Sequence, residues 1–221
     1  MGQYGQTAID DVVACIIRDE SRKANIPDWV PMGIAGAESG WAPGALGDEV
    51  SGPTVVVGGV TYNSYRDPAS GRYYSSIGLF QENICGGQGT GYSPTDLLNP
   101  RFNAQVGVPP IANAYVWAVQ NGYQGTDLIR QVATHSGHPG RIDPMDPRVS
   151  HIVDVTLRLI YNANGSMATW PPFNAAVCAG LPPPPPPLDS WSEGPAPTNR
   201  AEADAAIEAH LDRVGKLIYL F

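Results

Sequence analysis

The stretch Gly33–Trp41, with the sequence GIAGAESGW, places one acid, Glu38, among small and apolar residues. We expect it to close a helix that begins after Asp28 and ends at Gly40, because Asp is a favourable N-cap and Gly a favourable C-cap. Apolar surroundings and the negative end of the helix dipole both favour the protonated carboxyl. Glu38 should therefore have a raised pKa, as a general acid near neutral pH requires. The same residues allow a second interpretation, in which Glu38 is a solvated residue near a helix end.

Helices are also expected on both sides of this stretch, because apolar residues recur there at helical spacing. We expect them over residues 7–25, 102–121, 126–134 and 147–161. Thr7 and Asp10 resemble a capping box at the start of the first helix. Asp146 followed by Pro147 is a strong start signal for the last.

Between residues 44 and 91 the helical spacing is lost. Two short runs, Thr54–Val57 and Val60–Tyr62, flank Gly58-Gly59, a pattern that is typical of a β-hairpin. The sequence therefore predicts a mainly α, α+β fold, in which a helical domain carries a small β-hairpin insertion after its second helix.

The C-terminal part of the chain has a different composition. Six consecutive prolines, Pro182–Pro187, predict a stiff polyproline spacer. Beyond it, an apolar stripe indicates a helix that packs on another, through Ile207, Leu211, Val214 and Ile218. We therefore expect a helical domain over residues 1–168, a Pro-rich linker over 169–198 and a C-terminal docking helix over 199–221.

Composition excludes several classes of function. The 221 residues carry a formal net charge of −8 and their Lys and Arg residues are scattered, so binding to nucleic acid is not expected. No apolar run reaches the roughly 18 residues of a transmembrane helix. The N-terminal MGQYGQTAIDD has no basic segment followed by an apolar run, so no signal peptide is visible.

Three cysteines, Cys15, Cys85 and Cys178, lie far apart in the chain and form no Cys-x-x-Cys or Cys/His cluster. A zinc site is therefore not expected, and no other cofactor is predicted. Cys15 lies in an apolar helical segment and is most simply a buried thiol. The sequence leaves open whether Cys85 pairs with Cys178.

Four short motifs, taken in order, resemble the family of lysozyme-like soluble lytic transglycosylases. They are Glu38-Ser39-Gly40-Trp41, Ser76–Gln81 (SIGLFQ), Leu98–Gly107 (LNPRFNAQVG) and His135–Gly140 (HSGHPG). The last stands where many members have Tyr-Asn-Ala-Gly-Pro-Gly, so the tyrosine that usually touches the catalytic Glu is not evident. The similarity spans roughly residues 8–165.

The resemblance implies a muramidase that cleaves the β-1,4 bond between N-acetylmuramic acid and N-acetylglucosamine in peptidoglycan. Glu38 would be the catalytic acid, and afterwards the base, while the muramyl 6-hydroxyl attacks C1 and forms a 1,6-anhydro end. The matching motif positions that would hold substrate or support the acid are Ser39, Ser76, Gly78 and Gln81. Rings near the expected cleft add sugar contacts from Trp41, Phe80, Tyr92 and His135.

A second carboxylate would change the expected product. Asp48, Glu49 and Asp67 lie in the insertion, and any of them could activate water from roughly 6.5–9.5 Å away from the first carboxyl. The reaction would then be hydrolysis, as in a lysozyme. The other interpretation is that all three acids are solvated turn residues.

Two functions of other classes also remain open: a non-catalytic lysozyme-like module that binds glycan, and a structural virion component. The polyproline spacer and tail helix favour a protein of a phage tail or capsid that opens the cell wall locally during infection. We therefore expect peptidoglycan strands as one partner and other virion proteins as the other, bound through the C-terminal helix. The expected location is the virion, with action in the periplasm or cell wall, and non-classical secretion is the alternative.

Overall fold

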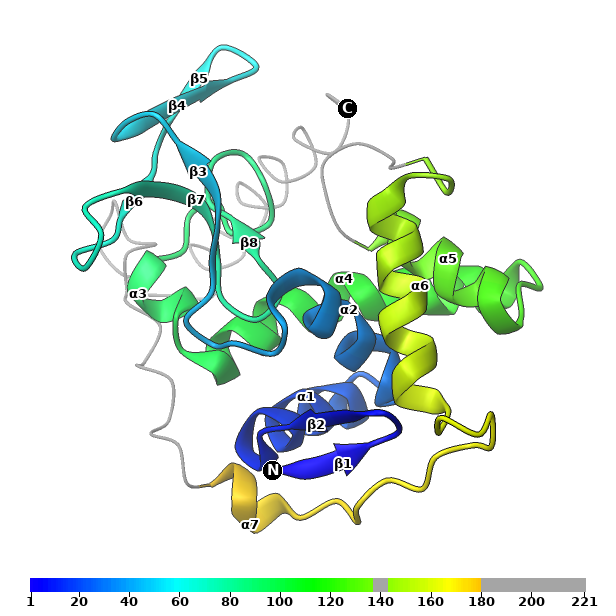
Figure 1. The fold of residues 1–221 in the computed structure, drawn as a ribbon. Coiled ribbons are helices and arrows are strands. Elements are labelled where there is room, and N and C mark those ends of the chain that lie inside the picture. Colours follow the sequence, from blue (N-terminus) through cyan, green and yellow to red (C-terminus); the bar gives the residue numbers. More distant parts are fainter. Residues whose placement is uncertain (137–142, 180–221) are drawn as a thin grey trace, which may run out of the picture. The chain divides into compact units, whose positions relative to one another are not determined.

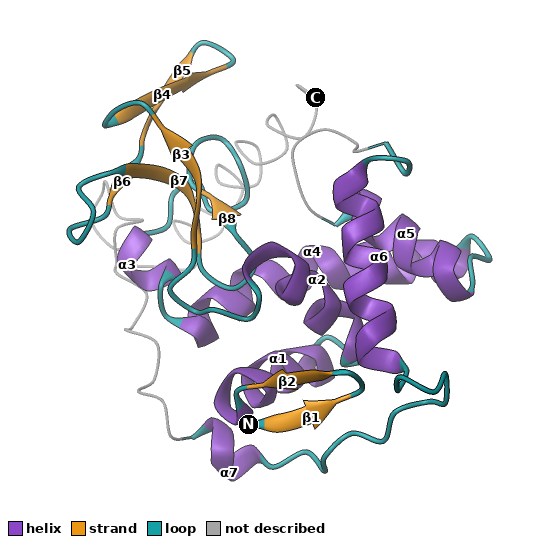
Figure 2. Cartoon of the chain, in the orientation of Figure 1, coloured by secondary structure: helices purple, strands orange, loops and turns teal. Residues whose placement is uncertain are grey.

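The computed structural model describes residues 1–136 and 143–179, which form helices and small antiparallel sheets (Figures 1 and 2). The fold is therefore mixed α+β. The polyproline spacer and the C-terminal helix expected from the sequence lie outside these residues.

Five helices build the core of the described part. They are α1 (Asp11–Lys23), α2 (Trp29–Ser39), α4 (Pro100–Gln120), α5 (Gly125–His135) and α6 (Pro147–Ile160). Helix α2 packs against α6, α1 packs against α4, and α5 packs against both α4 and α6. Their facing apolar side chains, among them Ile16, Met32, Val108 and Val149, are almost fully buried. Two single-turn helices, α3 (Pro94–Leu97) and α7 (Ala175–Cys178), complete the set.

The ends of these helices follow the local sequence closely. Gly40 closes α2 with a left-handed conformation (φ 61°), as expected for a glycine C-cap. Asp146 caps α6 by accepting a hydrogen bond from the Arg148 backbone at 2.8 Å. Asp28 stands before α2 but makes no cap bond, because its carboxylate pairs instead with the Arg18 guanidinium at 2.9 Å.

The first helix begins later than the sequence predicts. Residues Gly2–Tyr4 (β1) and Thr7–Ile9 (β2) pair as an antiparallel hairpin, so Thr7 belongs to a strand. Asp10 is the N-cap of α1, and its carboxylate accepts from the backbone N–H groups of Val12 and Val13. The expected capping box is therefore wrong, because the buried side chains of Tyr4 and Ile9 hold this short hairpin on the core.

The insertion contains the predicted hairpin and also a sheet that was not predicted. Strands β4 (Thr54–Val57) and β5 (Val60–Asn63) pair across Gly58-Gly59, and both glycines have positive φ. Beside them, β7 (Tyr73–Ile77) pairs with β3 (Leu46–Val50), β6 (Tyr65–Arg66) and β8 (Glu82–Asn83). Figure 1 shows these strands on one side of α2 and α4, with α5 and α6 on the other.

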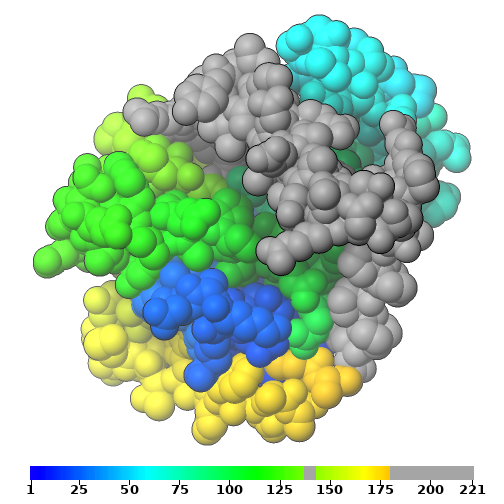
Figure 3. Space-filling model, turned by 180° about the vertical axis from the view of Figure 1, so that it is seen from behind, coloured from blue at the N-terminus to red at the C-terminus, as the bar shows by residue number. Residues whose placement is uncertain are grey.

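Residues 169–179, expected as the start of the linker, instead pack on the N-terminal part of the domain. Trp170 meets the Tyr4 ring edge-on at 5.0 Å, and the Arg18 guanidinium donates to the Pro171 carbonyl at 2.9 Å. Figure 3 shows this segment, in yellow and orange, against the blue N-terminal residues. The domain therefore reaches at least to residue 179 and does not end at 168.

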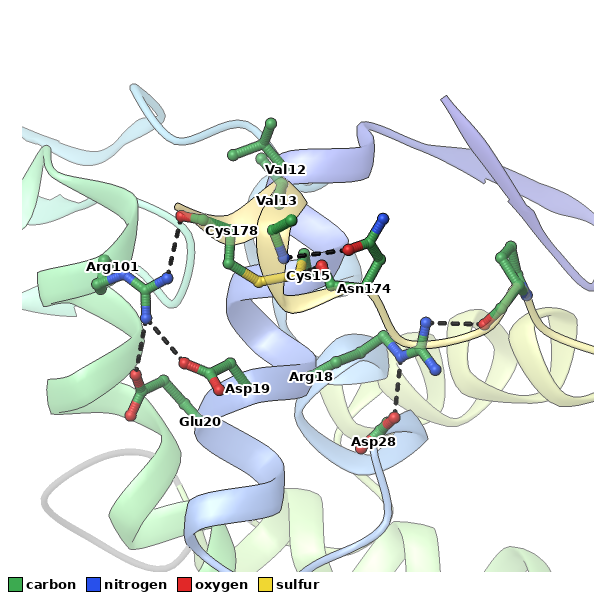
Figure 4. Close-up of a disulfide and its surroundings, with 12 residues drawn as sticks. Val12, Val13, Cys15, Arg18, Asp19, Glu20, Asp28, Arg101, Asn174 and Cys178 are labelled. Atoms are coloured by element: carbon green, nitrogen blue, oxygen red, sulfur yellow. Dashed lines mark hydrogen bonds and ion pairs between the residues drawn. A yellow bond between two sulfur atoms is a disulfide. The ribbon is translucent and has the colours of Figure 1, made fainter. Parts of the chain in front are cut away.

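A disulfide fastens this segment to α1. Cys15 on α1 and Cys178 on α7 are joined, with their Cα atoms 5.4 Å apart (Figure 4). Arg101 from α4 lies beside the bridge and donates to the Cys178 carbonyl at 3.2 Å. The expectation that Cys15 is a thiol is thus corrected. The open question about Cys85 is also answered, because Cys85 is a free, buried cysteine and does not pair with Cys178. The separation of 163 residues between the partners hides this pairing in the sequence.

Within the described ranges, no helix has the length and apolar character needed to cross a membrane.

Candidate active site

A cleft of about 580 Å³ runs between the end of α2, the sheet and the start of α6. Its wall is apolar where Ile34, Phe80 and Ile152 line it. Its polar lining includes Glu38, Asp48, Gln81, Glu82, Arg148 and His151. Within the described part of the chain, elements far apart in the sequence therefore bring three acids and one arginine to a single cleft.

Glu38 lies in the last turn of α2 and is partly buried at the cleft wall. Burial, and after it the negative charge of Asp48, raises the pKa of Glu38 to about 7, although the charge of Arg148 acts in the opposite direction. The raised pKa expected from the sequence is thus present. A carboxyl with this pKa is protonated in a large fraction of molecules at neutral pH, so it can donate a proton to a bound substrate.

Ser39 and Gly78 position this acid and do not line the cleft. The Ser39 hydroxyl lies 2.9 Å from the Ala35 carbonyl and 2.8 Å from the Leu79 carbonyl, which ties the end of α2 to the turn after β7. Gly78 (φ 81°) is buried in that turn, where a Cβ would come within 2.5 Å of the Leu97 carbonyl. Gly78 itself is covered by Leu97 and Asn103, while Phe80 and Gln81 of the same segment line the cleft.

The side chain of Asn103 completes the support of the turn. It is fully buried on α4, accepts from the Phe80 backbone N–H at 2.8 Å and donates to the Ile77 carbonyl at 2.9 Å. The turn is thus held from two sides, by α2 through Ser39 and by α4 through Asn103.

Three of the expected substrate-binding residues do line the cleft: Ser76, Phe80 and Gln81. Gln81 adopts a positive φ of 50°, and its amide donates to the Gly78 carbonyl at 2.9 Å. Ser76 on β7 donates its hydroxyl to the Asp48 carboxylate at 2.5 Å. These bonds fix the polar edge of the cleft opposite α6.

The other three expected contacts lie outside the lining of this cleft in the described part of the chain. Trp41 packs on the core and donates its indole N–H to the Met32 carbonyl at 2.9 Å. Tyr92 meets the Phe102 ring edge-on at 5.4 Å. His135 stacks on Trp117 at 4.0 Å between ring centroids. Each of these rings thus packs against neighbouring side chains. Ser136, the residue after His135, lines the cleft instead.

Of the three acids considered as a second carboxylate, only Asp48 lies in the cleft. Glu49 points to the surface and pairs with Arg72 at 3.0 Å. Asp67 accepts hydrogen bonds from the hydroxyl of Ser70 and the backbone of its own turn, which lower the pKa of this carboxyl. Glu49 and Asp67 therefore follow the second interpretation given to them, that of surface and turn residues.

Glu82 is the acid that sequence reasoning missed. It lies on β8, is only 4% exposed and still lines the cleft. Burial, and after it the negative charge of Glu38, raises the pKa of Glu82 to about 8. A signal was present: Glu82 follows Gln81 directly and is the only acid between Asp67 and Asp96. Arg148, which brings a positive charge to the cleft from α6, was also missed.

Comparisons with models of protein families, with curated proteins and with solved structures found no match. The cleft and its side chains therefore carry the functional proposal.

Proposed function

We propose that this protein is a lytic transglycosylase, a muramidase that cleaves the β-1,4 bond between N-acetylmuramic acid and N-acetylglucosamine in peptidoglycan. One observation carries the proposal: Glu38 stands on the wall of an open cleft with its pKa raised to about 7. An acid that keeps its proton near neutral pH can protonate the oxygen of a leaving sugar. The motifs around Glu38 and Gln81, which resemble those of lysozyme-like transglycosylases, support the same chemistry.

The reaction can be written with Glu38 as the only group that gives and takes a proton. Glu38 gives its proton to the glycosidic oxygen, and the bond between that oxygen and C1 of the muramyl sugar breaks. The positive charge that develops at C1 is stabilised by nearby negative groups. Asp48, held by Ser76, is such a group in the cleft. The muramyl 6-hydroxyl then attacks C1 and gives its proton to the Glu38 carboxylate, which leaves a 1,6-anhydro end and restores the acid.

Hydrolysis is the second candidate, because Asp48 shares the cleft with Glu38. In this version Asp48 takes a proton from a water molecule, the water oxygen bonds to C1, and the product has an ordinary reducing end. A glycan-binding or structural module without catalysis is less well supported, because such a module need not keep the Glu38-Ser39 and Gly78–Gln81 motifs, which resemble those of transglycosylases.

The disulfide and the sequence of the tail support the proposed place of action. Disulfides such as Cys15–Cys178 persist in oxidising environments, so this bond supports work outside a reducing cytoplasm. We place the enzyme on a phage particle, with residues 199–221 docking to other virion proteins and the cleft acting on the cell wall. Secretion without a particle is the alternative.

Mass spectrometry of digested peptidoglycan tests both the activity and its type. Purified sacculi treated with the wild-type protein should release muropeptides that end in 1,6-anhydro-muramic acid. Reducing ends, heavier by one water, would show hydrolysis and make Asp48→Asn the next variant to test. The absence of any released muropeptide would contradict the proposed function.

A further inference from the structure

The carboxyl group of Glu82 occupies an unusual position. Only 4% of the residue is exposed, yet it lines the cleft, and no described residue donates a hydrogen bond to its carboxyl. No polar side-chain atom in the described part is both sealed from solvent and without a partner. Because Glu82 lines the cleft, its carboxyl is in a position to bond to a ligand there.

Helix α4 leaves space for this carboxyl at Gly107, which has no side chain. A Cβ added at Gly107 would lie 2.7 Å from Glu82 Oε1 and 2.6 Å from Cγ of Phe80. Any larger residue at position 107 would therefore push against the acid. The Glu82 carboxyl thus packs closely against the backbone of Gly107, next to the Phe80 ring, in mostly apolar surroundings.

The charged and titratable groups that face the cleft influence the protonation of Glu82. They are Glu38 from α2, Asp48 from β3, and Arg148 and His151 from α6, while α4 contributes only Gly107 and Ile111. Among the described lining residues, only Arg148 has a guanidinium, and its side chain is 70% exposed and paired with Asp146 at 2.8 Å. With its pKa raised to about 8, Glu82 carries a proton at neutral pH. It therefore presents both an O–H donor and a carbonyl acceptor to the cleft.

We propose that Glu82 is a substrate-binding residue that acts as a neutral carboxylic acid, donating its O–H to an oxygen of an N-acetylhexosamine and accepting from a sugar hydroxyl or amide N–H. This proposal rests on the proposed function, since it takes a glycan as the ligand. Uncharged sugars offer hydrogen-bonding groups of both kinds, and an unpaired buried acid gains most from such a ligand. Ionisation of Glu82 removes the donor, so binding should weaken at alkaline pH.

The test measures binding of a chito-oligosaccharide, a β-1,4 oligomer of N-acetylglucosamine, by calorimetry between pH 6 and pH 9. Glu38→Gln is the background, so that cleavage does not interfere. In this background the dissociation constant should be lowest near pH 6 and should rise several-fold towards pH 9. Adding Glu82→Gln, a neutral side chain of the same shape with a donor and an acceptor, should keep the affinity within about twofold at pH 6 and remove the pH dependence. Adding Glu82→Leu should weaken binding about three- to tenfold at pH 6, as expected for one or two lost hydrogen bonds.

One control variant and the activity of the wild type separate the possible failures. Glu49→Gln removes an exposed acid outside the cleft and should change neither the affinity nor its pH dependence. If Glu82→Leu binds as tightly as its background, or if the background shows no pH dependence, the proposal for Glu82 is wrong, even where the wild type still cleaves peptidoglycan. If the wild type neither cleaves peptidoglycan nor binds the oligosaccharide, the proposed function is wrong as well.

Discussion

The pKa of Glu38 is set by its burial and by two charged neighbours that come from different elements. Burial at the cleft wall and the charge of Asp48 on β3 stabilise the protonated form, and Arg148 on α6 stabilises the ionised form. A change at either charged neighbour should therefore move the pKa of Glu38, and the two changes should move it in opposite directions.

The first prediction uses this opposition. Asp48→Asn removes a negative charge, so the pKa of Glu38 should fall by about half a unit or more, and Arg148→Gln should raise it by a similar amount. A ¹³C NMR titration of the Glu38 carboxyl measures both shifts without any need for activity. Arg72→Gln, which removes a surface arginine that pairs with Glu49, is the matched control and should leave the titration unchanged. Shifts of the same sign for Asp48→Asn and Arg148→Gln would contradict the assignment of these charges.

At the scale of elements, the turn after β7 determines where the cleft residues stand. Ser39 of α2 and Asn103 of α4 hold its backbone, and the turn leads directly into Phe80, Gln81 and Glu82. Close packing at Gly78 is part of this arrangement, because α4 leaves no space for a side chain there.

The second prediction compares two glycines with the same φ of 81°. Gly78→Ala and Gly59→Ala both place a side chain in a left-handed backbone, which costs about 1–2 kcal/mol. Only Gly78→Ala also collides with Asn103 and with the Leu97 carbonyl, since nothing lies within 4 Å of a Cβ at Gly59. Chemical denaturation should therefore show Gly78→Ala to be at least about 1 kcal/mol less stable than Gly59→Ala. Equal losses would mean that the turn is not packed as described.

The elements also show how far sequence reasoning reaches. The end of α2 at Gly40, the hairpin at Gly58-Gly59 and the start of α6 after Asp146 were predicted correctly, because residues next to one another determine each of them. The N-terminal hairpin was missed, because it is stabilised by the burial of Tyr4 and Ile9 on a core that distant helices build. Short strands of three residues carry little periodic signal of their own.

The candidate site shows the same division. The sequence identified Glu38, Ser76, Phe80 and Gln81, whose motifs are local. The rings of Trp41, Tyr92 and His135 lie outside the described lining of the cleft, and their packing partners could not be read from the local sequence. Glu82 and Arg148 were missed because their meeting with Glu38 depends on tertiary structure alone.

At the scale of the whole described domain, the disulfide joins residues that are 163 positions apart. A bond that closes a long loop lowers the entropy of the unfolded chain, typically by an amount worth about 2–4 kcal/mol of stability. It also holds residues 169–179 on α1, where Trp170 meets Tyr4.

The third prediction follows from this bond. A reducing agent, or the double substitution Cys15→Ser with Cys178→Ser, should lower the free energy of unfolding by about 2–4 kcal/mol. Thermal unfolding with and without reductant measures the effect. The double variant should no longer respond to reductant, whereas Cys85→Ala, which alters the free cysteine, should respond as the wild type does. A wild-type melting temperature that is unchanged by reduction would contradict the account of the disulfide.

The fourth prediction concerns the pH dependence of stability. Glu38 and Glu82 have folded-state pKa values of about 7 and about 8, above the roughly 4.3 of an unfolded chain. The folded state therefore binds more protons than the unfolded state between these pKa values. The stability that the two acids contribute is complete below about pH 4.3 and is lost as the pH rises to about 8. Urea denaturation should show that raising the pH from 5 to 8.5 costs the wild type about 2 kcal/mol or more relative to a variant with both acids changed to Gln. Parallel pH curves for the two proteins would show that these acids titrate normally.

The most direct test of the central claim is the rate at which Glu38→Gln cleaves purified peptidoglycan, compared with the wild type and with Glu49→Gln. Gln has the shape of Glu but no acidic proton, so the fold should be kept, as circular dichroism and thermal unfolding can verify. We predict that Glu38→Gln loses at least about a hundredfold in rate, as the removal of a general acid requires, while Glu49→Gln remains as active as the wild type. Cleavage by Glu38→Gln at the wild-type rate would contradict the assignment of Glu38 as the catalytic acid.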